Sequence, residues 1–248
     1  GETGLEVASV IRLIDSLKPV RADDITDPVL IAAVQHTVEL DGVNVPMNKK
    51  TPKEAQTWLS VLRGQGIVEG VLRRFGFEVR EPHEHGARAK RAVAALAYIG
   101  GQDMTAIEEM LQKHGGFGGS AGPIRGISAR TCDVIGTAAR IAEILHPELD
   151  LTDRSERLRI RLNLGIPGQA TDLGREAGQE LARGNYLALV RAGLTSSERI
   201  MTASDDAILA CVADSAERLA VVRKAAVAMQ ARSKARDAGT PYLPPYAA

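Results

Sequence analysis

The sequence has few aromatic residues: Phe, Trp and Tyr together make up only 3% of its 248 residues. Large rings are therefore scarce in any core that it forms, and the apolar interior has to be built from Ala, Leu, Ile and Val. That mixture favours closely packed helices. The hydrophobic fraction of 44% is typical of a globular protein, and the length allows one large domain or two small ones.

Cysteine and net charge are equally scarce. The two cysteines, Cys132 and Cys211, stand far apart without a CxxC pair, which predicts a reducing compartment and no disulfide framework. The 31 basic residues balance the 31 acidic ones, so any surface for nucleic acid has to be local. No apolar run approaches the roughly 18–20 residues of a membrane span, and no signal peptide opens the sequence. We therefore expect a cytoplasmic protein with no membrane partner.

Catalytic and metal-binding motifs are also missing from the sequence. The glycine-rich stretch HGGFGGSAGPIRGISART, residues 114–131, lacks the GxxxxGK[ST] pattern of a phosphate-binding loop. We interpret it as a connection between helices. His83 and His85 flank Glu84, but no further His or Cys pair stands at zinc-ligand spacing. The sequence predicts no metal site and no cofactor in this chain, and it leaves open whether the chain belongs to an enzyme.

Helical periodicity and helical start signals run through nearly the whole chain. Asp27 before Pro28 is typical of a helix start, and Thr51 with Glu54 forms a capping-box pattern. The predicted helices span residues 4–17, 27–40, 52–63, 85–99, 103–113, 121–145, 152–164, 170–182, 184–192, 196–212 with a break, and 215–232. Residues 76–82 could form a short extended piece. The predicted fold class is all-α, a multi-helix bundle followed by a helix-hairpin-helix-like C-terminal module.

Breaks in this pattern suggest the domain organisation. The stretches at 80–88 and 164–169 are polar or rich in Gly and Pro, and the tail from Gly239 holds three prolines. We predict an N-terminal helical region at 1–84, a helical bundle with one long helix at 85–166, the hairpin module at 167–236, and a Pro-rich tail at 237–248.

The best candidate for a binding function is the stretch LARGNYLALVRAGLTSSERI, residues 181–200. Two short helices with small residues at their ends let backbone N–H groups approach a nucleic-acid phosphate, and nearby Arg or Lys would complete the contact. A plain helical hairpin is the alternative interpretation. The following helix is the most basic segment, with no acidic residue between Arg218 and Asp237.

The order of these segments resembles the C-terminal part of Ski2-like superfamily-two DNA helicases. The residues that carry the resemblance are the glycine-rich loop, the long helix ending ARIAEIL, the stretch RLRIRLNLGI at 157–166, and LVRAGL at 189–194. It covers roughly residues 85–230. In that family, a ratchet helix in the bundle grips single-stranded DNA, and a helix-hairpin-helix module binds the strand as it leaves.

By that resemblance, the helix at 121–145 is the ratchet, and Arg125 is the residue best placed to meet a phosphate or a base. Tyr186 either packs the two hairpin helices together or stacks on a base. The predicted nucleic-acid-binding residues on the long helix and the hairpin are Arg125, Arg130, Thr131, Arg183, Gly184, Asn185, Tyr186 and Arg191.

The resemblance also implies a motor, whose Walker loop and DExH box are not in this sequence. ATP and magnesium, and the DEAD/DEAH-box hydrolase activity with its role in DNA repair, are expected to belong to motor domains of the same polypeptide. The implied partners are those domains and single-stranded or forked DNA. Two alternatives remain. One is a helical module that regulates the motor through protein contacts. The other is a helix-hairpin-helix DNA glycosylase, which needs a catalytic Asp just beyond the hairpin; Asp205 and Asp206 lie downstream, but the hairpin has no lysine.

Overall fold

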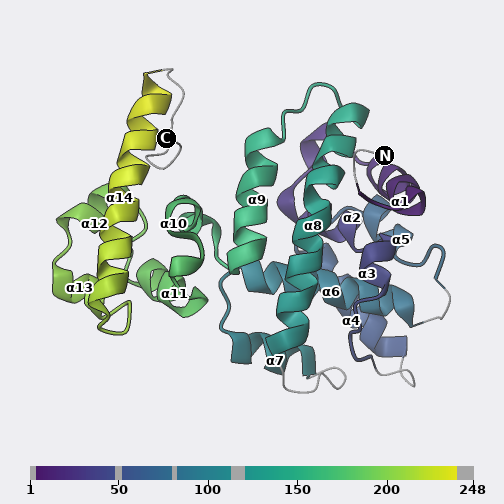
Figure 1. Cartoon of the computed structure of the whole chain (residues 1–248). Coiled ribbons are helices and arrows are strands. Elements are labelled where there is room, and N and C mark those ends of the chain that lie inside the picture. Colours follow the sequence, from purple (N-terminus) through teal and green to yellow (C-terminus); the bar gives the residue numbers. More distant parts are fainter. Residues whose placement is uncertain (1–3, 48–51, 80–82, 113–120, 239–248) are drawn as a thin grey trace. The chain divides into compact units, whose positions relative to one another are not determined.

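The computed structural model of the chain describes residues 4–47, 52–79, 83–112 and 121–238 (Figure 1). These residues form α-helices, joined by turns and by three short 3-10 helices, and they contain no strand. The predicted all-α fold class is therefore confirmed. Residues 114–120 of the glycine-rich stretch and the tail from residue 239 lie outside the described residues.

The chain divides into two compact units, Gly1–Gly165 and Ile166–Ala248. This division lies within the Gly- and Pro-rich stretch at 164–169, where Gly165 ends a helix in the left-handed conformation with φ 67°. The first unit contains α1 (Val7–Leu17), α2 (Asp27–Val34), α3 (Val38–Asp41), α4 (Pro52–Gly64), α5 (Glu69–Arg74), α6 (Glu84–Ile99), α7 (Met104–Gln112), α8 (Ala121–Leu145) and α9 (Thr152–Leu164). The second contains α10 (Thr171–Ala177), α11 (Arg183–Arg191), α12 (Ser197–Thr202), α13 (Asp205–Leu209) and α14 (Ala216–Asp237).

Helix α6 forms the centre of the first unit. It packs against α2, α4, α7, α8 and α9, and nearly all of its residues from Gly86 to Ile99 are buried. Six residues between 87 and 97 are alanines, whose short side chains allow neighbouring helices to pack close to α6. At Gly86 there is no room for a side chain, because an added Cβ would stand 2.7 Å from the Cβ of Ala55 on α4. Helices from both sides of residue 84 therefore share one core.

One predicted helix, at 27–40, is interrupted by a turn at residues 35–37. Helix α2 ends at Val34, and the backbone N–H groups of Gln35, His36 and Thr37 then donate to carbonyls three residues back, which makes a tight turn before α3 begins. The side chain of Thr37 also donates to Val34 O at 2.9 Å. The turn is fixed from outside, because Arg12 on α1 donates to His36 O at 3.1 Å.

Other boundaries differ in ways that have local causes. The helix predicted at 170–182 ends at Ala177, because Gly178 takes a backbone conformation, φ 52° and ψ −131°, that breaks the helix. Helix α5 is short and was not predicted. The last helix continues five residues beyond its predicted end at 232, to Asp237. Residues 76–78 form a turn instead of the extended piece suggested by the sequence.

The second unit is held together by capped helices around a small apolar core. Serines cap three successive helices: Ser196, Ser204 and Ser215 each accept a hydrogen bond from the backbone N–H three residues on. The guanidinium of Arg223 on α14 donates to Ala203 O at 2.8 Å and thereby satisfies a carbonyl at the end of α12. Arg232 binds the largely buried carboxylate of Glu176 on α10 at 2.8 Å.

A fully buried ion pair ties α6 to α4. Lys90 Nζ lies 2.9 Å from Glu54 Oε1, with side-chain exposures of 0% and 1%. It also donates to Pro46 O at 2.7 Å, while Trp58 Nε1 donates to the same Glu54 oxygen at 3.1 Å. Burial lowers the pKa of Lys90, although the carboxylate of Glu54 opposes that shift. Each charge depends on its partner, because water does not reach either one.

We predict that Lys90→Met destabilises the first unit by about 3–5 kcal/mol, since it leaves the carboxylate of Glu54 buried without its cation. Urea unfolding followed by the fluorescence of Trp58, the only tryptophan, measures this loss. The double variant Glu54→Gln, Lys90→Met should recover most of it, because no buried charge remains. A loss below about 1 kcal/mol in the single variant would contradict the assigned role of the pair.

Candidate nucleic-acid interface

The long helix α8 has one face in the core and one face in solvent. Its 25 residues begin with Pro123 in the first turn, which suits a helix start. The apolar period places Ile124, Ile127, Val134 and Ile135 in the core of the first unit. Helix α9 packs beside it after the turn at 146–151 (Figure 1).

The outer face of α8 carries small residues between its arginines. The exposed positions of this stripe are Gly122, Arg125, Gly126, Ala129, Arg130, Asp133 and Arg140. A Cβ added at Gly126, or at Gly136 ten residues further along the helix, would meet no atom within 4 Å. A glycine in a helix interior costs roughly 0.5–1 kcal/mol relative to alanine. No packing contact in the described residues requires glycine at position 126 or 136. Because both positions lack a side chain, a ligand can approach the helix backbone closely there.

The two predicted arginines of α8 lie at the two edges of this outer stripe, about 140° apart around the helix axis. Arg125 is exposed and makes no hydrogen bond or ion pair with any residue that the structure describes. Arg130 lies 3.4 Å from Asp133 one turn on, with side-chain exposures of 63% and 64%. Such an exposed pair contributes little to stability. Both guanidinium groups are therefore available to a phosphate.

Thr131, which the sequence placed with these arginines, lies on the opposite face. It is 0% exposed. Its Oγ1 donates to Ile127 O at 2.8 Å and accepts from Gln35 Nε2 at 3.0 Å. The signal was in the sequence, because Thr131 stands four residues after Ile127 and three before Val134 and thus continues the apolar face. Its hydroxyl joins α8 to the end of α2.

In the second unit, two of the predicted residues are buried. The side chain of Asn185 accepts from Ala182 N and donates to Cys211 O, each at 3.2 Å, so it both caps α11 and links it to the end of α13. Tyr186 is 0% exposed and its hydroxyl donates to Gly178 O at 2.7 Å. Burial raises the pKa of this tyrosine. Base stacking on Tyr186 would require the unit to open.

The remaining predicted residues of the second unit lie at opposite ends of α11. Arg183 and Gly184 stand in its first turn, and Arg191 is its last residue. At 1.5 Å per residue, the two arginines are about 12 Å apart along the axis, and each contacts other residues of the chain. They are therefore not one cluster. The turn that follows is set by Gly193, with φ 71°, and by the cap at Ser196.

Some basic residues of α14 bind groups on neighbouring helices, and others are exposed. Arg223 and Arg232 are bound to groups on α12 and α10, as described above. Lys224, Lys234 and Arg236 are exposed. The basic segment noted in the sequence thus includes two arginines that hold the unit together.

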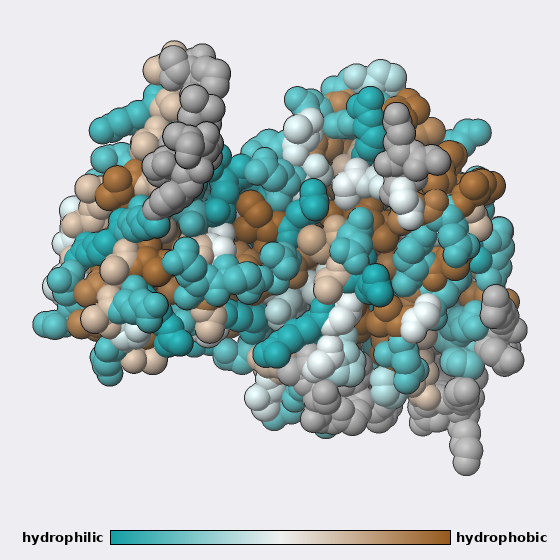
Figure 2. All heavy atoms as spheres, in the orientation of Figure 1, coloured by the Kyte–Doolittle hydropathy of each residue, from teal (hydrophilic) through white to brown (hydrophobic). Residues whose placement is uncertain are grey.

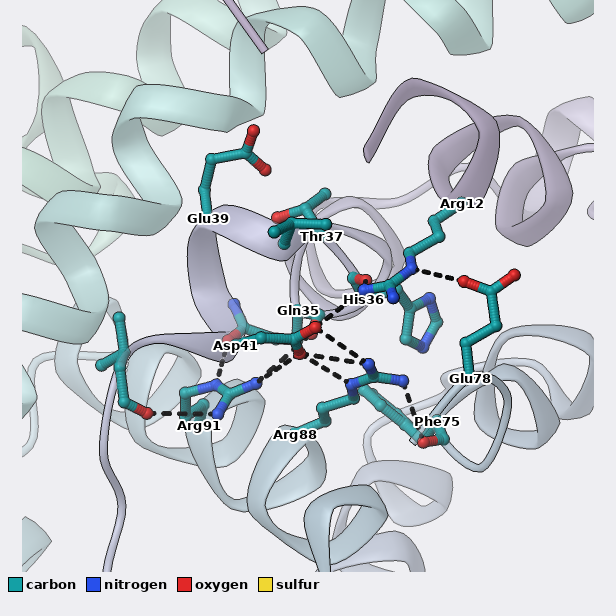
Figure 3. A network of polar contacts seen from close by, with 12 residues as sticks. Arg12, Gln35, His36, Thr37, Glu39, Asp41, Phe75, Glu78, Arg88 and Arg91 are labelled. Atoms are coloured by element: carbon teal, nitrogen blue, oxygen red, sulfur yellow. Dashed lines mark hydrogen bonds and ion pairs between the residues drawn. The ribbon is translucent and has the colours of Figure 1, made fainter. Parts of the chain in front are cut away.

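A cluster of buried arginines in the first unit was not found from the sequence (Figure 3). Asp41, at the end of α3, accepts from Arg88 Nε at 3.2 Å and from Arg12 Nη1 at 2.7 Å, and Arg91 Nη2 lies 3.9 Å away. Arg88 also donates to the carbonyls of Phe75 and Phe77. Because the cluster joins side chains of α1, α3 and α6, no local sequence pattern predicts it.

His36 lies against this cluster and is buried. Its Nδ1 lies 2.5 Å from Ser16 Oγ, and its ring meets the ring of Phe75 edge-on, with centroids 4.5 Å apart. Its Nε2 has no hydrogen-bond partner among the described residues. Burial and the neighbouring arginines lower the pKa of His36 well below 6.5.

A comparison of the sequence with protein-family models found no matching family, and a comparison with curated proteins found no matching relative. Across the described ranges, no helix is both long and apolar enough to cross a membrane. In the same residues, no three or more His, Cys, Asp or Glu side chains are grouped so that they could hold a metal ion.

We predict that His36 makes the first unit less stable as the pH falls below about 6.5. The unfolded chain takes up the proton near pH 6.5, whereas the folded chain resists it, so the contribution of His36 is complete above that pH and declines towards pH 5. One proton gives a slope of at most about 1.4 kcal/mol per pH unit. Urea unfolding between pH 5 and 8 should show this slope weakened in His36→Gln. An identical slope in the variant would contradict the prediction.

Proposed function

We propose that this chain is the nucleic-acid-binding accessory region of an ATP-dependent, Ski2-like DNA helicase, and that α8 grips single-stranded DNA by phosphate contacts. The observation that carries the proposal is the outer stripe of α8. Arg125 and Arg130 stand about 7.5 Å apart along the helix axis, and Gly126 and Ala129 between them leave the backbone accessible.

This arrangement suits a sequence-independent grip. Guanidinium groups bind phosphate oxygens with two hydrogen bonds, and such contacts do not read bases. A polynucleotide backbone can lie close to α8 because no side chain projects at Gly126 or Gly136. Arg140 is a third exposed cation on α8, although it also pairs with Glu143 at 3.1 Å.

The rest of the proposal follows from the same helicase assignment. Single-stranded or forked DNA and the motor domains of the same polypeptide would be the partners, and ATP with magnesium would bind to those domains. Gly184, which is exposed in the first turn of α11, and the exposed cations of α14 would add contacts in the second unit. A place in DNA repair within the cytoplasm belongs to this proposal.

A second candidate function is a helical module that contacts the motor as a protein. Its supporting observation is the exposed apolar pair on α1, where Val7 and Ile11, one turn apart, are 76% and 52% exposed. Hydrophilic residues cover much of the face seen in Figure 2, with apolar residues scattered among them. DNA binding that weakens with salt separates the two candidates, because contact through apolar side chains would not show it.

We predict that the chain binds labelled single-stranded and forked DNA more tightly than duplex DNA and that Arg125→Ala weakens binding equally for all sequences. Fluorescence anisotropy between about 50 and 200 mM salt would show the dependence of log K on log salt reduced by about 0.7 for one lost contact to a single strand.

The matched control is Arg21→Ala, which removes an arginine that is 80% exposed in the same unit but does not lie on α8. It should leave the salt dependence unchanged. Equal effects of the two substitutions would remove Arg125 from the interface. Absence of DNA binding at low salt would favour the protein-contact module.

A further inference from the structure

A small cavity opens at the surface of the first unit beside the arginine cluster. It lies where α1, the end of α2, α5 and α6 meet, and its volume is about 20 Å³. That is room for little more than one water-sized atom. The groups that line it are almost all charged or polar, so the cavity is suited to a polar ligand atom.

One lining group is a buried ring nitrogen without a partner. His36 is 2% exposed, its Nδ1 is engaged by Ser16, and its Nε2 has no hydrogen-bond partner among the described residues. When Ser16 donates its hydroxyl hydrogen to Nδ1, the ring proton resides on Nε2. In that tautomer Nε2 carries a buried N–H group without an acceptor, which is costly, and His36 is one of the residues that line the cavity.

Two arginines at the cavity also have donors left over. Arg12 uses Nε for Glu78 and Nη1 for Asp41 and His36 O, whereas its Nη2 has no bond to a described residue. Arg74 lies 3.7 Å from Asp15 and its guanidinium carbon lies 4.7 Å from the centroid of the Phe77 ring.

Arg88 contrasts with these two arginines, because Asp41 and the carbonyls of Phe75 and Phe77 occupy all three of its nitrogens. The unused donors are therefore those of His36, Arg12 and Arg74. They come from three separate helical segments and line one small space.

The charges around the cavity favour an anion. Three arginines, at positions 12, 74 and 88, line the cavity together with the carboxylates of residues 15 and 78, and Asp41 pairs with Arg12 and Arg88 beside it. Of these carboxylates, Asp15 and Glu78 are 48% and 62% exposed, so they can turn into solvent. With those two carboxylates turned away, the positive charge of the arginines at the cavity attracts an anion and repels a cation.

We propose that this cavity binds a terminal phosphate group, with one phosphate oxygen accepting from His36 Nε2, Arg12 and Arg74. Three donors from different directions fit a tetrahedral oxyanion, and the rest of the ligand lies outside, along the 56% exposed ring of Phe77. Free inorganic phosphate and the terminal phosphate of a nucleic-acid strand share this chemistry; the second source rests on the proposed function.

The test follows the ring nitrogens of His36 and the guanidinium signals of Arg12 and Arg74 by NMR as inorganic phosphate is added to about 10 mM, with chloride at equal ionic strength as the reference. We expect saturable shifts at all three side chains. Arg74→Gln should weaken the response of His36 at least about tenfold. Arg73→Gln, an exposed neighbour on α5 that does not line the cavity, should change it less than about twofold.

Single-stranded DNA with a 5′-phosphate, compared with the same strand ending in a 5′-hydroxyl, distinguishes the two sources. A response to the phosphorylated strand at lower concentration assigns the site to a strand end, and a response to inorganic phosphate alone assigns it to the free ion. Because inorganic phosphate is tested without DNA, this result does not depend on the proposed function. No saturable shift in the wild type, or equal losses in Arg73→Gln and Arg74→Gln, would overturn the proposal.

Discussion

The pairing of buried cations on α6 is the constraint on which the first unit depends. Arg88, Lys90 and Arg91 are between 0% and 3% exposed on a helix that is surrounded by other helices. An unpaired charge at such a depth would cost several kcal/mol. The carboxylates of Asp41 and Glu54 must therefore reach α6, and this requirement brings α4 and the last residue of α3 to it. The turn after α2 and the place of α1 follow, because Arg12 joins both Asp41 and His36 O.

This pairing divides the arginines of the first unit into two groups. Those that face inward are bound to carboxylates and carbonyls, as Arg161 is to Asp27 at 2.7 Å. Those on the outer stripe of α8 are exposed, and two of them pair only with carboxylates three residues on in the same helix. The balanced net charge of the chain therefore conceals a local surplus, since the acidic residues that neutralise it are partly used inside. A local phosphate-binding surface can exist on a chain whose charges cancel overall.

The sequence predicted the elements well where the controlling signals are local. Both ends of α8 were placed correctly, because Pro123 and the apolar period lie within the helix itself. The end of α2 was misplaced, since it depends on an arginine from another helix. The burial of Arg88 and Arg91 could not be predicted, because a basic run is usually a solvated face and the partner, Asp41, lies 47 residues before Arg88. Among the candidate site residues, Arg130 and Thr131 were predicted together, although only Arg130 is exposed. Successive side chains of a helix point about 100° apart, so a residue next to an exposed one can be buried.

The most direct test of the account is the paired measurement of stability and single-stranded DNA affinity on Gly126→Leu. The account predicts a first unit as stable as the wild type or up to about 1 kcal/mol more stable, because leucine favours helix and its Cβ meets nothing within 4 Å. It also predicts an affinity lower by about tenfold or more, because the side chain keeps the DNA backbone away from α8. A stable variant that binds single-stranded DNA as tightly as the wild type would contradict the claim that the outer stripe of α8 is the binding surface.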